Sequence, residues 1–511
     1  MNAAPENPFL AASVHAMAHA RADQQDSSMA TGPTGPTRTL ADADRQYTWL
    51  GPGHFGGCIS GPYPDGRRVV WSNGRRSIVK LDHDTLEVLA RLPVGDETEL
   101  TEAEMRAAVA GLDELEGQDA IGHAVGLALG FMTGLDGVYS LLDCDHTLFL
   151  GRKDGVVAYH EVDPSDPASE IVVRNEWVRP DHIDGSFVGI NLTFDGRLVM
   201  TTDHGWVVCL ARDFSDYDAI RLPGADAAAE HCARMEAERG HSGYGWVRTS
   251  LCVDEANGIY VSSVDHTHKV VWTGSELSLD PAHGAWSAEY RNGSGTGSGT
   301  TPCLMGFGDE DRFVVIGDGD DIVNITLLWR DDIPDDWEQL SNAPSRRIAG
   351  LGPAHMGDPN LTEVRTEQSI TVAGHGAMTV NNQPATVPDS FPERGVRLLA
   401  FFLGHHEIYR PVGLHKYEWD PTTRRLRQAW INRTVSSPNA VPFVSLGANL
   451  VYTCGTRAGK WTIEALDWTT GEEAFHLVVG DSSCNTLGAA ISLDQDDRLV
   501  YGTIFGKLRI L

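Results

Sequence analysis

Short apolar runs alternate with polar, turn-forming residues along most of this 511-residue chain. Clear examples are Arg68-Val-Val-Trp71, Arg312-Phe-Val-Val-Ile316 and Arg498-Leu-Val-Tyr-Gly502, each with Gly, Asp or Asn close by. Runs of this length and composition are typical of antiparallel strands joined by tight turns. From residue 46 onward we therefore expect a mostly antiparallel, all-β protein.

One phrase recurs along the chain: a strand, then Asp-x-x-Thr, then a second strand. It contains Asp82 and Thr85 near the start, and Asp467 and Thr470 near the end, with looser copies between them. Asp and Thr supply hydrogen-bonding groups that tight turns use. Self-similarity of this kind predicts a propeller or a solenoid.

The strands fall into eight groups, of which the last holds only three strands before residue 511. The groups span Gly56–Leu92, Val138–Trp177, Phe187–Leu222, Trp246–Tyr290, Arg312–Trp329, Ser369–Ile431 (with Arg397–Leu403 as one strand), Val441–Val479 and Leu487–Leu511. An extended segment at Gln46–Leu50 could supply the missing outer strand and so close the ring without free sheet edges. We therefore predict an eight-bladed β-propeller that forms a single domain over residues 46–511.

Two segments depart from the strand pattern. Residues 1–45 are rich in Ala, Ser, Thr, Gly, Pro and Asp, and we expect a flexible or surface-wrapping arm with at most one short helix, around Phe9–Ala22. Thr101-Glu-Ala-Glu104 has the spacing of a capping box and opens a stretch with helical periodicity. We expect a small helical insertion at about residues 98–133, which either decorates the rim or covers one face as a lid.

Charge and cysteine usage narrow the choice of partners and compartment. The formal net charge of −31 argues against nucleic acid and anionic membranes, because both require a basic surface. The eight Cys residues are scattered singly through the sequence, several of them within apolar strands, which favours buried free thiols in a reducing compartment. No basic segment followed by an apolar core opens the sequence, and we expect a cytoplasmic protein without a membrane segment.

A resemblance to a known family rests on the second copy of the repeated phrase. Ala465-x-Asp467-x-x-Thr470-Gly471-x-x-x-Phe475 resembles the docking motif of quinoprotein-alcohol-dehydrogenase-like propellers, with Phe475 where that family has Trp. The resemblance implies the propeller fold from about residue 46 to 511, with the motif locking neighbouring blades. The family's dehydrogenases use pyrroloquinoline quinone with calcium, and many carry a disulfide between adjacent cysteines. This chain has no adjacent Cys pair, which argues against that cofactor, and fold does not imply function.

A candidate site follows from where a propeller places its loops. Loops that enter the innermost strands and loops that join second to third strands open at the same end of the channel. This places His182, Asp184, His204 and Asp265 together as candidate catalytic residues. The expected ligands of a divalent transition metal are His182, His204, His266 and His268. The alternative metal is Ca²⁺, which carboxylate or carbonyl oxygens of Asp and Asn would bind.

Other residues complete this hypothesis. Asp184 and Asp265 would orient the imidazoles or bind the metal, and Arg75, Arg457 and Asn439 would bind a small-molecule substrate. The alternative is that the Asp-His and Asp-Gly loops are only hairpin turns, which these residues form well.

We therefore expect a small-molecule enzyme, a metal-assisted hydrolase or lyase, with its site at the channel mouth. The alternatives are a non-enzymatic propeller scaffold that binds protein and, ranked last, a quinone-type oxidoreductase.

Overall fold

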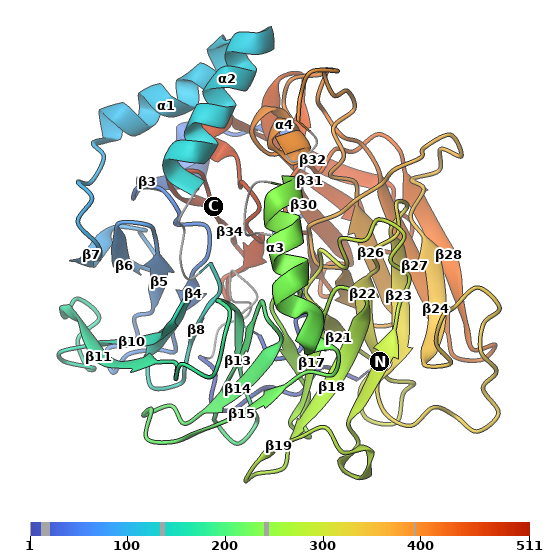
Figure 1. The fold of residues 1–511 in the computed structure, drawn as a ribbon. Coiled ribbons are helices and arrows are strands. Elements are labelled where there is room, and N and C mark those ends of the chain that lie inside the picture. The colour runs from blue at the N-terminus through green and yellow to red at the C-terminus, as the bar shows by residue number, and fades with distance from the viewer. Residues whose placement is uncertain (1, 12–20, 133–137, 240–244, 393–394) are drawn as a thin grey trace.

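The computed structural model describes residues 2–11, 21–132, 138–239, 245–392 and 395–511 (Figure 1). Their strands form eight sheets, each built on three or four antiparallel strands that follow one another in sequence. We number the sheets in chain order. The all-β prediction is confirmed, and the number of sheets equals the number of predicted strand groups.

The first four sheets take up the first half of the chain. Sheet 1 holds β4 (Cys58–Ile59), β5 (Val69–Asn73), β6 (Ser77–Asp82) and β7 (Val88–Pro93); sheet 2 holds β8 (Ser140–Leu142), β9 (Leu148–Arg152), β10 (Gly155–Glu161) and β11 (Ile171–Val178). Sheet 3 holds β12 (Phe187–Leu192), β13 (Leu198–Thr202), β14 (Trp206–Leu210) and β15 (Tyr217–Arg221); sheet 4 holds β16 (Cys252–Val253), β17 (Gly258–Ser262), β18 (His266–Trp272), β19 (Leu277–Ser278) and β20 (Trp286–Glu289).

The other four sheets complete the ring. Sheet 5 holds β21 (Cys303–Met305), β22 (Phe313–Gly317), β23 (Asn324–Trp329) and β24 (Ile348–Pro353); sheet 6 holds β25 (Thr371–Ala373), β26 (Gly376–Val380), β27 (Leu414–Asp420) and β28 (Arg425–Asn432). Sheet 7 holds β29 (Phe443–Ser445), β30 (Leu450–Arg457), β31 (Lys460–Asp467) and β32 (Glu473–Gly480), extended by β1 (Ser27–Ser28) and β2 (Arg38–Thr39). Sheet 8 holds β33 (Ser492–Leu493), β34 (Leu499–Gly502), β35 (Gly506–Ile510) and β3 (Arg45–Trp49).

The ring closes as the sequence predicts. Strand β3 pairs antiparallel with β35, from Arg45 opposite Ile510 to Trp49 opposite Gly506. The start of the chain thus supplies the fourth strand of the last sheet, so the prediction for Gln46–Leu50 is confirmed. This closure leaves β35 paired on both sides, which removes a sheet edge that could otherwise pair with another chain.

Residues 22–28 of the N-terminal arm lie against inner strands, whereas β2 pairs with β32, the outer strand of sheet 7. The carbonyls of Ala22, Asp23, Gln25 and Asp26 accept hydrogen bonds from the backbone N–H groups of Val253, Leu304, Val372 and Val444, at 2.8–2.9 Å. Each bond reaches the inner strand of the next sheet, from sheet 4 to sheet 7. This part of the arm therefore crosses the inner strands of four consecutive sheets. Most of the helix expected around Phe9–Ala22 falls on residues 12–20, which lie outside the described residues.

Three helices gather over one side of the propeller (Figure 1). These are α1 (Glu102–Glu114), α2 (Gly117–Leu127) and α4 (Val396–Leu403), and a π-turn at Ala128–Met132 extends α2. The capping box is confirmed, because the Thr101 hydroxyl accepts from the Glu104 N–H at 3.3 Å and the Glu104 carboxylate accepts from the Thr101 N–H at 2.8 Å. Short 3₁₀ turns lie at Asp42–Asp44, Ala225–Ala227, Pro281–His283 and Ser482–Cys484.

The strand predicted at Arg397–Leu403 is wrong, because these residues form helix α4. The run is almost continuously apolar, so its periodicity does not separate strand from helix. Leu399, Phe402 and Leu403 pack into a cluster with residues of α1 and α2, including Leu112 and Ile121. Contact with the insertion therefore selects the helical form. No helix among the described residues combines the length and the apolar character that a membrane crossing requires.

The repeated Asp-x-x-Thr phrase forms the turns that were expected of it. One Asp82 carboxylate oxygen accepts from the N–H groups of Asp84 and Thr85, and Asp467 accepts likewise from Thr469 and Thr470. Gly471 then follows with a φ of +73°, in the left-handed region that favours glycine. A Cβ there would lie 2.4 Å from the Trp430 ring of sheet 6. The motif thus brings sheet 7 into close contact with sheet 6.

Candidate functional site

Helix α3 (Ala228–Arg239) lies across the turns of sheets 3 and 4. Its face toward the sheets carries Ala228, His231, Cys232 and Met235, at the spacing of an amphipathic helix. Ala228, His231 and Met235 are each at most 5% exposed. Two of the four positions that should hold hydrocarbon side chains hold His and Cys instead. The sequence signal that could have revealed α3 is the Ala-, Glu- and Arg-rich stretch 225–239, which all but lacks strand-forming residues.

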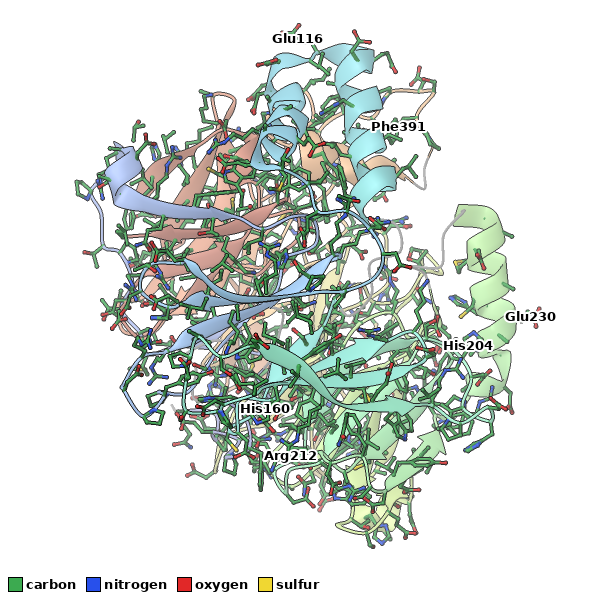
Figure 2. The ribbon with its side chains drawn as sticks, turned by 90° about the vertical axis from the view of Figure 1, so that its left-hand side faces the viewer. Glu116, His160, His204, Arg212, Glu230 and Phe391 are labelled. Atoms are coloured by element: carbon green, nitrogen blue, oxygen red, sulfur yellow. The ribbon has the colours of Figure 1, made fainter. Side chains whose placement is uncertain are left out.

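A cavity of about 430 Å³ separates α3 from sheet 4. Figure 2 labels Glu230 on α3, with His204 on the turn of sheet 3 beside it. The cavity is lined by Pro223, Gly224, Ala227, Glu230, His231, Arg234, Trp246, Val264, Asp265, His266 and Ser287. Its lining therefore combines two imidazoles, two carboxylates and a guanidinium with a few apolar groups, as expected of a small-molecule site.

Asp265 and His266 form a hydrogen-bonded pair on the turn between β17 and β18. The carboxylate oxygen lies 2.9 Å from Nδ1 of the imidazole. This hydrogen bond raises the pKa of His266, although burial opposes it, and the same bond lowers the pKa of Asp265. The expectation that Asp265 orients an imidazole agrees with this geometry. A carboxylate on Nδ1 holds one ring orientation and leaves Nε2 for proton transfer.

His231 faces the cavity from the helix side and is 5% exposed. Its Nδ1 accepts a hydrogen bond from the Arg234 guanidinium at 3.1 Å. Burial is the main cause that lowers the pKa of His231, and the imidazole is therefore neutral with its proton on Nε2. Among the described residues, this buried Nε2 has no hydrogen-bond partner. Such an orphaned donor is costly unless a ligand accepts from it.

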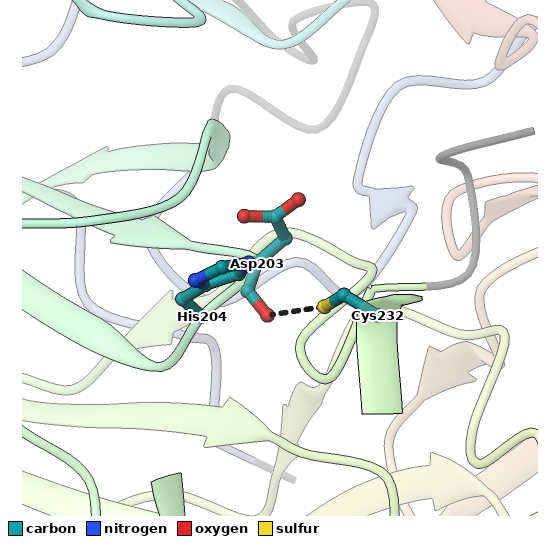
Figure 3. Close-up of side chains that lie close together, drawn as sticks. All are labelled: Asp203, His204 and Cys232. Atoms are coloured by element: carbon teal, nitrogen blue, oxygen red, sulfur yellow. Dashed lines mark hydrogen bonds between the residues drawn. The ribbon is translucent and has the colours of Figure 1, made fainter. Parts of the chain in front are cut away.

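A second aspartate–histidine pair lies on the other side of α3. Asp184 accepts from His204 at Nδ1, at 2.9 Å, and from the Trp206 indole N–H at 2.6 Å. His204 and its neighbour Asp203 lie next to Cys232 of α3 (Figure 3). Burial raises the pKa of the Cys232 thiol to about 11 and also raises the pKa of Asp203.

The four histidines predicted as metal ligands do not converge as one set, although the rings of His266 and His268 stack with 5.9 Å between their centroids. His268 is fully buried, and its two ring nitrogens bind the hydroxyls of Ser263 and Ser287 at 3.0 Å, so neither is left for a metal. His182 packs edge-on against the Trp206 ring, and Nδ1 of His266 binds Asp265. In the part of the chain that the structure describes, two groups of three possible ligands do converge: Asp203, His204 and Cys232; and His83, Asp494 and Asp496. Only His204 belongs to the predicted set.

The residues predicted to bind substrate have partners within the chain. Arg75 pairs with Glu97 at 2.6 Å, and Arg457 pairs with Glu464 at 2.6 Å. The Asn439 amide donates to the Phe401 carbonyl at 2.8 Å, beside the end of α4. None of the three lines the cavity under α3. Arg75 lies between β5 and β6, Asn439 precedes β29 and Arg457 ends β30, and the sequence pattern did not reveal their partners within the chain.

A larger cavity of about 620 Å³ lies between loops of sheets 5 and 6. Its charged residues are Asp358, Glu363, Arg410 and Arg433. The two guanidiniums donate to backbone carbonyls, Arg410 to that of Thr456 and Arg433 to that of Gly357. The lining contains no imidazole. We therefore consider the smaller cavity, with its Asp265–His266 pair, the better candidate for chemistry.

Comparisons with known proteins show the fold. No protein-family model matches the chain. An uncharacterized protein of Archaeoglobus fulgidus is 30% identical over 518 residues, covering 99% of this chain and 89% of the relative. The quinohemoprotein alcohol dehydrogenase of Comamonas testosteroni matches with a TM-score of 0.50 and 12% identity, over 99% of this chain and 78% of that one. The quinohemoprotein alcohol dehydrogenase ADHIIG of Pseudomonas putida HK5 matches with a TM-score of 0.50 and 11% identity, over 99% of this chain and 80% of that one.

The resemblance expected from the Asp467–Phe475 motif is thus confirmed for the propeller fold. At this identity it carries no information on chemistry. All eight cysteines have free thiols, and no two are adjacent in sequence. The chain therefore lacks the residues for a disulfide between neighbouring cysteines.

Proposed function

The chain belongs to the same family as the Archaeoglobus fulgidus protein, and we propose that it is an enzyme that performs acid–base chemistry on a small molecule in the cavity under α3. The reaction class is hydrolysis or lyase-type elimination. One observation carries the proposal: the Asp265–His266 pair and the unpartnered Nε2 of His231 line the same cavity. This arrangement offers a base on one wall and a hydrogen-bond donor on the other.

His266 acts as the general base. Asp265 holds Nδ1 and thereby fixes the proton there, so that Nε2 carries the lone pair. In hydrolysis this nitrogen removes a proton from water as the water attacks, and in elimination it removes a proton from a substrate carbon. The raised pKa of His266 makes the imidazole a stronger base.

His231 and Arg234 bind the oxygen on which negative charge develops. The neutral His231 donates from Nε2, and Arg234 adds a positive charge at the rim of the cavity. A donor that is already buried and oriented stabilises such charge without reorganisation during the reaction. The substrate should therefore carry a carbonyl, a carboxylate or another anionic oxygen group, and it must fit a cavity of about 430 Å³.

The test is a turnover screen of wild-type protein and two variants. The substrate panel contains carboxylate-bearing esters, lactones and β-substituted acids. Replacing His266→Gln should lower turnover by about 10² to 10⁴, which is the usual contribution of a general base. His283→Gln is the matched control, because His283 lies on the 3₁₀ turn between β19 and β20 of sheet 4, binds Ser278 and does not line the cavity.

Equal turnover in wild type and His266→Gln would contradict the proposed role. The scaffold alternative would be favoured by a different result: wild type and both variants turn over no member of the panel, and all three bind a macromolecule with the same affinity.

A further inference from the structure

We propose that Asp203, His204 and Cys232 form a binding site for one divalent transition metal ion of the zinc class, which fastens α3 to the turn between β13 and β14. The site goes beyond the chemistry proposed for the cavity, because it uses none of Asp265, His266 or His231. The two proposals can therefore fail separately.

The ligand set is the first argument. A thiolate, an imidazole and a carboxylate are the three side-chain types that bind zinc. One donor atom from each of Asp203, His204 and Cys232 lies within 4.8 Å of the other two (Figure 3). In tetrahedral zinc sites, bonds of about 2.0–2.3 Å place neighbouring ligand atoms about 3.3–3.8 Å apart. Contraction by about 1 Å therefore brings the three atoms into coordination distance.

The residues around the ligands are the second argument. Asp184 binds Nδ1 of His204 at 2.9 Å, which is the carboxylate–histidine arrangement that orients a metal-bound imidazole. The Ser186 N–H donates to the Asp203 carboxylate at 2.7 Å, and the Trp246 N–H donates to the Cys232 sulfur at 3.3 Å. Each of the three ligands is thus held by a group that fixes its orientation or supports its negative charge.

The backbone at Gly185 approaches two of the ligands closely. Gly185 has a φ of +86°, and a Cβ on it would lie 2.5 Å from a carboxylate oxygen of Asp203 and 2.8 Å from the Cβ of His204. A larger residue would therefore displace both ligands. The His204 side chain is 22% exposed, so water can reach it and complete the coordination.

The second group of possible ligands is a poorer metal site because a neighbouring arginine already balances its negative charge. His83, Asp494 and Asp496 lie beside Arg498, which pairs with both aspartates at 2.7–2.9 Å. A guanidinium already neutralises these carboxylates, so a dication has little to gain. Asp203, by contrast, forms no ion pair with Lys or Arg among the described residues. Its carboxylate and the Cys232 thiol are the anionic groups that a dication would compensate.

The test uses Co²⁺ as a spectroscopic probe on the full chain after removal of bound metal with a chelator. Titration should produce a thiolate-to-cobalt charge-transfer band that saturates at one cobalt per chain and disappears when Zn²⁺ is added. Cys232→Ser should abolish the band, whereas Cys144→Ser, which removes an exposed thiol elsewhere, should keep it.

Two further variants separate loss of a ligand from loss of the fold. His204→Gln should also abolish saturable binding, and Asp184→Asn should weaken it by about 10–100-fold, as is usual for a group that orients a ligand. Circular dichroism and the melting temperature of each variant without metal report whether it folds. A wild-type titration without the band, or a band that survives in folded Cys232→Ser, would overturn the proposal. Activity is not a readout, so the result does not depend on the cavity chemistry.

Discussion

His231 and Cys232 are consecutive residues of α3, yet they face two different aspartate–histidine pairs. His231 lines the cavity that also contains Asp265 and His266, whereas Cys232 lies beside Asp203 and His204. Asp203-His204 and Asp265-His266 occupy the same position in neighbouring sheets, between the second and third strands. One helix therefore contacts two equivalent turns, through His231 and Cys232.

The Asp265–His266 pair predicts a shift in a titration. Replacing Asp265→Asn removes the hydrogen bond to a carboxylate that raises the pKa of His266, so this pKa should fall. In the folded wild type the raised pKa stabilises the protein at pH values below the unfolded pKa of about 6.5, and this contribution is lost as pH rises through the folded pKa. The variant should therefore lose stability at the acidic end. NMR titration of the His266 ring protons measures the shift, and an unchanged His266 pKa would rule out the coupling.

The contact between sheets 6 and 7 predicts a large effect of one methyl group. Replacing Gly471→Ala places a Cβ 2.4 Å from the Trp430 ring, at a φ of +73°. The control is Gly459→Ala, which has the same φ of +73° but no atom within 4 Å of the new Cβ. The control should lose about 1–2 kcal/mol from backbone strain alone.

Gly471→Ala should lose about 1–3 kcal/mol more, because it overpacks the interface. Denaturant unfolding measures both free energies of unfolding. Equal losses in the two variants would show that the Trp430 contact does not restrict this position.

Lys507 predicts a pH dependence of stability at the closure of the ring. Its ammonium is fully buried in sheet 8 and donates to the carbonyls of His54, at 2.7 Å, Phe55 and Gly56, on the segment that enters sheet 1. Burial lowers the pKa of Lys507 to about 7. Between pH 7 and the ordinary lysine pKa of about 10.4, the unfolded chain binds more protons, so stability from this group rises with pH.

Lys507→Met should remove this rise and should lose about 1–3 kcal/mol, because buried carbonyls lose their donor. Denaturant unfolding at several pH values measures both effects. Lys153→Met, on an exposed turn, is the control and should change neither. A Lys507→Met curve parallel to that of wild type would contradict the assigned pKa.

The arm predicts protection of four amides. Deleting residues 1–28 removes the carbonyls that accept from the N–H groups of Val253, Leu304, Val372 and Val444. Hydrogen exchange at these four amides should accelerate, while β31, which lies within sheet 7 between two other strands, should stay protected. Each lost bond is worth about 0.5–1.5 kcal/mol, so the melting temperature should fall as well. Unchanged exchange at the four amides would show that the arm does not hold the inner strands.

The sequence by itself determined the features that depend on neighbouring residues. Alternating apolar runs predicted the strands, the Asp82 and Asp467 turns follow from side chains that bind the next backbone N–H groups, and the capping box at Thr101 spans one helical turn. Closure by Gln46–Leu50 was predictable because a last sheet of three strands requires a fourth. The pairing of Asp265 with His266 also lies within one turn.

Only the tertiary structure decided what depends on distant contacts. Arg397–Leu403 is a helix because the insertion packs on it, and His268 is not a ligand because Ser287, on another strand, occupies one of its nitrogens. Cys232, which lies beside Asp203 and His204, comes from α3, whose position over sheets 3 and 4 no local pattern specifies. Local hydrogen bonds and periodicity act within a few residues and can be read along the chain. Side chains from separate elements converge only where packing fixes those elements in space.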